Sequence, residues 1–189
     1  MRRFIIILLG AVTLSSCGYN SMVEKEEAIT SSWAKVETQY QRRSDLIPSL
    51  VNTVKGYADF EQETLTQVIE ARSKATSIQV DANDLSPEKI ANFQAAQSEL
   101  SGALSRLLVS VERYPELKAS QQFSQLQAQL EGTENRIAVA RDRYNEKVQD
   151  YNSYIRKFPK NLVAGMFDFE KKGYFEAESG SENAPEVEF

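Results

Sequence analysis

The 189-residue chain has no histidine and a single cysteine, Cys17, which removes most of the usual catalytic and metal-binding chemistries. Histidine is the commonest ligand of transition metals, and it supplies the base in Ser/His and Cys/His nucleophile pairs. The formal net charge of −5 lacks the basic footprint of a nucleic-acid-binding domain. The composition therefore predicts a protein that is not an enzyme and that has no metal, no cofactor and no nucleic-acid partner.

Glycine and proline are also scarce, with 8 and 5 residues respectively. Because these two residue types interrupt regular structure most strongly, long stretches without them favour long helices. The chain is long enough for one domain with a substantial core and too short to suggest two.

The first seventeen residues have the layout of a secretory signal. Arg2 and Arg3 precede an apolar run from Phe4 to Leu14, and Leu14-Ser15-Ser16-Cys17 follows. A transmembrane helix needs about 20 apolar residues, and this run has roughly half that number. The pattern fits a bacterial lipobox, so we expect residues 1–16 to be a signal peptide and Cys17 to carry the acyl chains. The domain would then stand outside the cytoplasm, anchored in the cell membrane or the outer membrane.

Apolar residues at intervals of three and four predict four amphipathic helices after Cys17. The first is expected to end near Arg42-Arg43, and the second to begin at Ser44-Asp45 with Pro48 in its first turn. The third is expected to begin at Ser86-Pro87. The fourth, about 120–158, has apolar residues at strict intervals of seven, namely Phe123, Leu130, Ile137, Tyr144, Tyr151 and Phe158.

This pattern predicts an all-α fold, a long antiparallel four-helix bundle of the up-and-down type with a coiled-coil-like seam. We expect the bundle to span residues 17–175, with 161–175 against its end and the asparagines at 145 and 152 bonded to neighbouring helices. Residues 176–189 are acidic and rich in small polar types, which predicts a disordered tail.

Four charged residues fall on the predicted apolar faces and predict a partly buried polar network: Glu61, Arg72, Glu134 and Arg141. Buried charges need partners, so pairing across the bundle is expected, with the register of the helices as its main role. Bundle metal sites combine glutamate with histidine, which makes a metal at Glu61 and Glu134 a weak alternative.

Two further groups are candidates for contacts with other molecules. The helix junction with Arg42, Arg43 and Asp45 is explained by helix capping or, alternatively, by an interaction surface. Four lysines near the last aromatic residues are candidates to face the membrane, because four helices return the chain to its anchored end: Lys157, Lys160, Lys171 and Lys172.

Several runs of the chain resemble the LemA family of bacterial envelope proteins over residues 19–175. The longest are Arg42-Arg43-Ser44-Asp45-Leu46-Ile47-Pro48-Ser49-Leu50, Glu112-Arg113-Tyr114-Pro115-Glu116-Leu117-Lys118-Ala119 and Glu131-Gly132-Thr133-Glu134-Asn135-Arg136-Ile137-Ala138. The shorter ones include Tyr19-Asn20, Trp33, Tyr144-Asn145, Tyr151-Asn152 and Tyr174-Phe175.

The resemblance implies a four-helix bundle on a membrane and no established reaction, so it carries no catalytic residue onto this chain. The usual member has a transmembrane helix before the bundle, in the place of the lipobox here. We expect a non-enzymatic envelope protein that binds or scaffolds partner proteins. The alternatives are an accessory or regulator of a membrane protease or transport complex, an uncharacterised envelope enzyme, and a protein that simply binds the lipid surface.

Overall fold

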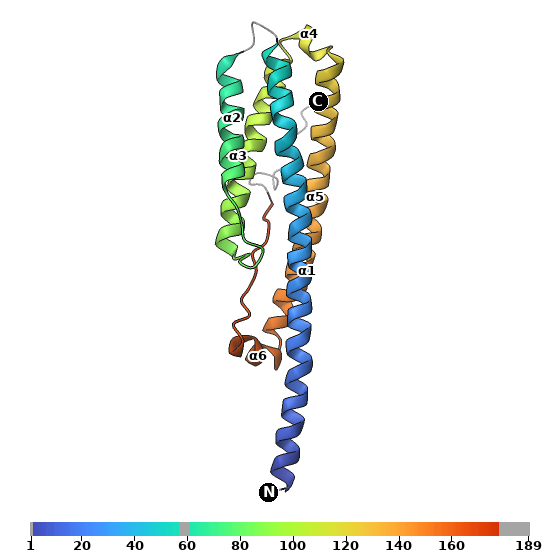
Figure 1. The fold of residues 1–189 in the computed structure, drawn as a ribbon, viewed down its shortest axis with the longest axis vertical. Helices are drawn as coiled ribbons and strands as arrows, with labels where there is room; N and C mark the ends of the chain where they lie inside the picture. The colour runs from blue at the N-terminus through green and yellow to red at the C-terminus, as the bar shows by residue number, and fades with distance from the viewer. Residues whose placement is uncertain (1, 57–60, 178–189) are drawn as a thin grey trace, which may run out of the picture.

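The chain folds into a long bundle of antiparallel helices (Figure 1). The structure is a computed structural model that describes residues 2–56 and 61–177, with the backbone alone for residues 2–17. The described part contains six helices and no strand: α1 (Arg2–Lys55), α2 (Gln62–Ser77), α3 (Pro87–Val111), α4 (Pro115–Lys118), α5 (Gln121–Arg156) and α6 (Lys160–Met166). The four long helices α1, α2, α3 and α5 run alternately up and down, which confirms the predicted all-α bundle.

The prediction of a new helix at Ser44-Asp45 is wrong, because α1 is one helix of 54 residues that contains Pro48. A proline inside a helix has no N–H for the carbonyl four residues earlier, which here belongs to Ser44. Arg72 of α2 donates its Nε–H to that Ser44 oxygen at 2.9 Å. Buried Ile47 and Leu50 on the two sides of Pro48 continue one apolar face. A partner helix thus supplies the hydrogen bond that the proline removes, and α1 continues.

This replacement bond predicts that Arg72 and Pro48 are energetically coupled. Arg72→Met should lower the free energy of unfolding by about 1–2 kcal/mol, because the Ser44 carbonyl loses its donor. In a Pro48→Ala background the loss should be smaller, since the introduced alanine has an N–H that can bond to the same carbonyl. Urea denaturation of the double-mutant cycle measures the coupling. Equal losses in both backgrounds would contradict this account of α1.

The other helix ends are closer to the sequence pattern. Pro87 is the first residue of α3 after Ser86, as predicted. The Ser120 hydroxyl accepts from the Phe123 N–H at 3.5 Å and caps α5. The 36 residues of α5 correspond to a length of about 54 Å. The seven-residue series is buried from Phe123 to Tyr151, whereas Phe158 lies beyond the helix end and is exposed.

The core divides into two apolar clusters along the rod. The upper cluster includes Leu50, Leu65 and Leu107, and the lower cluster includes Trp33 and Tyr144. In the lower half, the chain after α6 turns back and runs up the bundle as an extended segment (Figure 1). We call residues 171–177 the strap.

Candidate functional site

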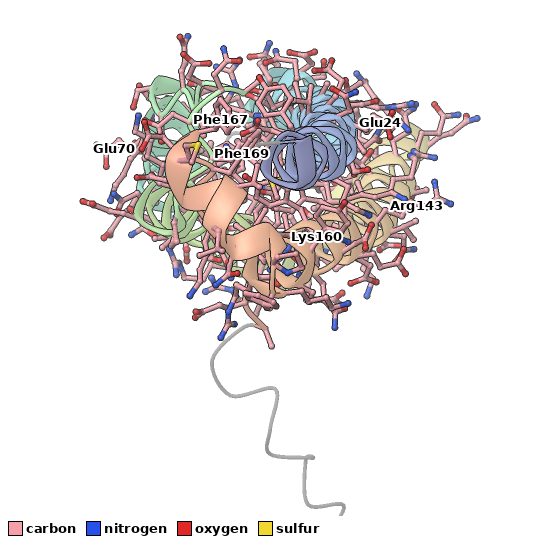
Figure 2. The ribbon with its side chains drawn as sticks, turned by 90° about the horizontal axis from the view of Figure 1, so that it is seen from below. Glu24, Glu70, Arg143, Lys160, Phe167 and Phe169 are labelled. Atoms are coloured by element: carbon pink, nitrogen blue, oxygen red, sulfur yellow. The ribbon has the colours of Figure 1, made fainter. Side chains whose placement is uncertain are left out.

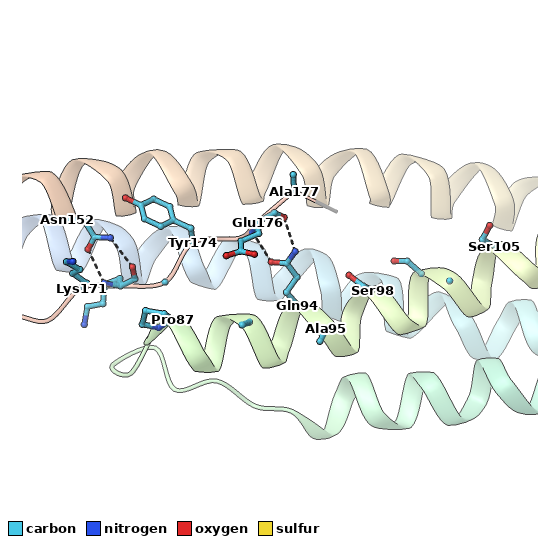
Figure 3. A pocket seen from close by; sticks show the side chains of 15 residues that line it. Pro87, Gln94, Ala95, Ser98, Ser105, Asn152, Lys171, Tyr174, Glu176 and Ala177 are labelled. Carbon is cyan, nitrogen blue, oxygen red and sulfur yellow. Dashed lines mark hydrogen bonds between the residues drawn. The ribbon is translucent and has the colours of Figure 1, made fainter. Parts of the chain in front are cut away.

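The strap lies in a groove between α3 and α5 and is bonded through its main chain (Figure 3). The Asn152 amide donates to the Lys172 carbonyl at 2.9 Å and accepts from the Lys172 N–H at 3.0 Å. Asn145 makes the same pair of bonds with Phe175, at 2.8 and 2.9 Å. Each of these amides therefore bonds to both main-chain groups of one strap residue, in the way that a neighbouring β-strand would. The asparagines were expected to bond to helices, and their partner is instead the strap.

The opposite wall of the groove contributes similar bonds. Gln94 of α3 donates to the Glu176 carbonyl at 2.8 Å and accepts from its N–H at 2.9 Å. The Gly173 N–H donates to the Leu85 carbonyl at 2.8 Å, and the Tyr144 hydroxyl donates to the Gly173 carbonyl at 3.1 Å. Side chains and a loop carbonyl thus bond to the main chain of Lys172, Gly173, Phe175 and Glu176, in place of a neighbouring strand.

Phe175 anchors the strap in the lower core cluster and is almost fully buried. Its ring stacks on Trp33 with 6.0 Å between centroids and meets Tyr144 edge-on at 5.4 Å. The guanidinium carbon of Arg141 lies 4.9 Å from the same ring. Because Trp33 belongs to α1 and Tyr144 to α5, the strap connects the two longest helices of the bundle.

Gly173 lies close to the first turn of α3. A Cβ at this position would lie 2.7 Å from the Pro87 Cα and 3.1 Å from the Ile90 Cβ. Gly173→Ala should therefore lower the free energy of unfolding by about 1–3 kcal/mol, because the obstacle includes helix backbone. Gly165→Ala in α6 is the matched control, since a Cβ added there would meet nothing within 4 Å apart from its chain neighbours and its own helix backbone. Thermal denaturation of the two variants compares them, and equal stabilities would contradict the close packing of the strap.

A polar layer separates the two core clusters, and Arg43 lies at its centre with only 1% of its surface exposed. Its guanidinium donates to Glu134 Oε1 at 2.8 Å, to Ser101 Oγ at 2.7 Å and to Gln97 Oε1 at 2.6 Å. The aromatic ring of Tyr40 covers it at 5.1 Å. The prediction that Arg43 belongs to an interaction surface is therefore wrong, because the side chain points into the bundle. Its neighbour Arg42 is exposed, as is Asp45, which accepts from the Gln41 amide at 2.7 Å.

The four charged residues predicted to form one network are held separately. Glu134 pairs with Arg43, and Glu61 pairs with Arg113 at 2.7 Å at the surface. Arg72 bonds to the Ser44 carbonyl, and Arg141 donates to the Glu176 carbonyl at 2.8 Å. The predicted pairing of charges across the bundle holds for Glu134, with a different arginine. The sequence signal for that partner was its spacing, since Arg43 continues the apolar series of Val36, Tyr40 and Ile47.

Burial is the main cause of the pKa shifts of two core tyrosines. It raises the pKa of the Tyr144 and Tyr151 hydroxyls, so both stay neutral at physiological pH. Partial burial also raises the pKa of Glu37, which lies outside the core and lines a cleft between α1 and the loop after α2. In the part of the chain whose side chains are described, no group of three or more His, Cys, Asp or Glu residues is placed to hold a metal ion.

The four lysines predicted to face a membrane divide into two kinds. Lys157 and Lys171 are exposed, and the Lys160 ammonium lies 3.6 Å from the centre of the Tyr154 ring. Lys160 lies at the lower end of the bundle, at the opposite end of α6 from Phe167 (Figure 2). Lys172 differs, because its side chain is largely buried and pairs with Glu26 of α1 at 2.6 Å. Lys172 therefore holds the strap and does not face outward.

Two predictions fall wholly or partly outside the described residues. The structure does not describe the side chain of Cys17, and it does not describe residues 178–189 of the expected acidic tail. The first residue of that tail, Glu176, is bonded to Gln94 and Arg141 and belongs to the strap, so the packed chain extends past residue 175. No helix in the described part is long and apolar enough to cross a membrane.

The fold and the groove define a class of protein: an all-α antiparallel bundle that holds its own C-terminal segment between two helices. The sequence model that describes the LemA family matches residues 32–189, so the chain belongs to the LemA family. The match includes every run quoted above except Tyr19-Asn20, which precedes it.

Three relatives illustrate the similarity of the chain to other proteins. Protein LemA of Metamycoplasma hominis is 27% identical over 175 residues, which cover 92% of this chain and 76% of that protein. Magnetosome protein MamQ 2 of Paramagnetospirillum magneticum is 25% identical over 179 residues, 84% of this chain and 64% of that protein. Magnetosome protein MamQ of Magnetospirillum gryphiswaldense is 23% identical over 192 residues, 90% of this chain and 69% of that protein.

Proposed function

We propose that the chain is a lipid-anchored protein of the bacterial envelope that binds partner proteins and catalyses no reaction. The observation that carries this proposal is the groove between α3 and α5. Side-chain amides on the walls of this groove bond to the main-chain groups of an extended segment. Main-chain hydrogen bonds of this kind are typical of peptide binding. The polar side chains around it, including Asn145, Asn152 and Arg141, are engaged in holding the strap.

The groove continues along α3 past Ala177, the last described residue of the strap, and is lined there by Ser98, Gly102 and Ser105 (Figure 3). The whole groove, including the part beside the strap, is open and has a volume of about 930 Å³. Small and hydroxyl-bearing side chains let a backbone approach closely and supply donors and acceptors. The occupant that fits is an extended segment of a partner protein, laid along α3 in continuation of the strap.

Photocrosslinking in intact cells tests this proposal. A benzophenone side chain at Ser98 or Ser105 should give the same protein adduct, mapped by mass spectrometry to one short segment of the partner. Asn92 is the matched control, since it is exposed on the same helix, does not line the groove and lies about 120° round the helix from Ser98. Adducts with lipid or with this chain alone, or the same adduct from Asn92, would overturn partner binding in the groove.

The lipid anchor rests on the lipobox pattern and has its own test. Mass spectrometry of the protein purified from membranes should show an N-terminus at Cys17 with a mass increase of two or three acyl chains. Two or three chains give stable anchoring, whereas a single chain holds only marginally. A mature protein that still begins at Met1 would contradict the anchor without affecting the groove.

A further inference from the structure

The lower end of the bundle exposes an unusual concentration of large apolar side chains. Four of the five most exposed in the described part lie within ten residues: Phe158, Leu162, Met166 and Phe167. The first is 81% exposed and Met166 is 75% exposed. We call these four residues the collar. A cluster of exposed apolar side chains marks a surface that is covered by a membrane or by another molecule.

The collar is fixed beside α1, close to the apolar start of the chain. The ring of Tyr19 contacts Phe167 at 4.9 Å and Phe169 at 5.6 Å. The backbone of α1 is helical from Arg2, so Leu14 precedes Tyr19 by about 7 Å along the helix axis. In Figure 1, α6 lies beside the lower part of α1, and α1 extends beyond it toward the N-terminus.

The charges around the collar are those of a membrane interface. Arg156, Lys157 and Lys160 precede or begin α6, and the first two are exposed. Asp168 and Glu170 follow it and are also exposed, on the side where the chain turns toward the strap. Aromatic and long apolar side chains next to cations are typical of segments that lie in the headgroup region of a bilayer.

We infer that the collar inserts into the surface of the lipid bilayer and seats the bundle directly on the membrane. Either kind of anchor would hold the collar at the bilayer surface. An acylated Cys17 is two residues from Tyr19, which contacts the collar. If residues 4–14 were not cleaved, this apolar run would enter the bilayer about 7 Å from Tyr19 along the helix axis. The inference therefore rests on the membrane location in the proposed function and does not depend on the type of anchor.

Depth-dependent fluorescence quenching tests the collar on the full chain. Protein purified from membranes is reconstituted into vesicles that contain anionic lipid and lipids with brominated acyl chains. Tryptophan is introduced singly as Phe158→Trp, Leu162→Trp or Phe167→Trp, with the buried Trp33 kept as a common background. The added emission should fall by on the order of half in brominated vesicles, because an interfacial side chain reaches the upper acyl region. Val109→Trp, exposed on α3, should be unaffected.

The outcomes separate the collar from the anchor. A protein that floats with the vesicles but shows no quenching at the three collar positions retains the anchor and overturns the collar. Failure to float overturns both. If the protein formed a concentration-dependent dimer that kept the brominated lipids away from the collar, the collar would be a contact surface for a second copy. That result would also overturn the inference. Quenching at all three positions but not at Val109 supports it, whatever the mass of the N-terminus.

Discussion

Phe175→Ala is expected to lower the free energy of unfolding by about 3–4 kcal/mol, because it empties the space between two helices. The ring is almost fully buried between Trp33 of α1 and Tyr144 of α5. For a protein of this size the loss corresponds to a fall in Tm of roughly 10 °C. Urea denaturation followed by circular dichroism measures the change in free energy, and the emission of Trp33 reports the loss of its stacking partner.

Tyr174→Ala is the matched control, since it removes an aromatic ring from the adjacent strap residue. Tyr174 is partly exposed and lines the open groove, so its loss should cost less than about 1 kcal/mol. If both variants lost the same stability, the strap would act as a surface segment and not as part of the core.

Glu134→Ala is expected to cost about 2–4 kcal/mol, because it leaves the buried Arg43 guanidinium without its anion. Arg43 would keep neutral acceptors in Gln97 and Ser101, which bond to it but do not balance its charge. The loss should be visible as a lower urea midpoint with an unchanged denaturant dependence.

Glu61→Ala is a close control for this prediction. Both glutamates are 43% exposed, and they pair with arginine at 2.8 and 2.7 Å. The difference lies in the partner, since Arg113 is 62% exposed whereas Arg43 is 1% exposed. Glu61→Ala should therefore cost less than about 1 kcal/mol, as exposed pairs do. Similar losses in the two variants would show that burial of the arginine does not determine the strength of the pair.

The helices could be predicted from the sequence because their signals are local. Ser86-Pro87 starts a helix as expected, and the seven-residue spacing on α5 selects buried residues from Phe123 to Tyr151. Pro48 misled the prediction because its cost is offset by Arg72, which lies 28 residues away from Ser44 in the sequence. A distant donor leaves no trace in the local pattern.

The strap escaped prediction for a similar reason. It has no helical or strand periodicity, and its main-chain partners Asn152, Asn145 and Gln94 lie 20, 30 and 82 residues away from the groups that they bind. Arg43 was assigned to the surface together with Arg42, although its spacing from Tyr40 and Ile47 places it on the buried face. In both cases the residues of the site were visible in the sequence, and their partners were not.

The position of Phe175 also sets the order in which the protein can be completed during synthesis. Trp33 leaves the ribosome more than a hundred residues before the ring that stacks on it. The lower core therefore stays open on one side while α1 to α6 are synthesised, and it closes only when the strap follows them.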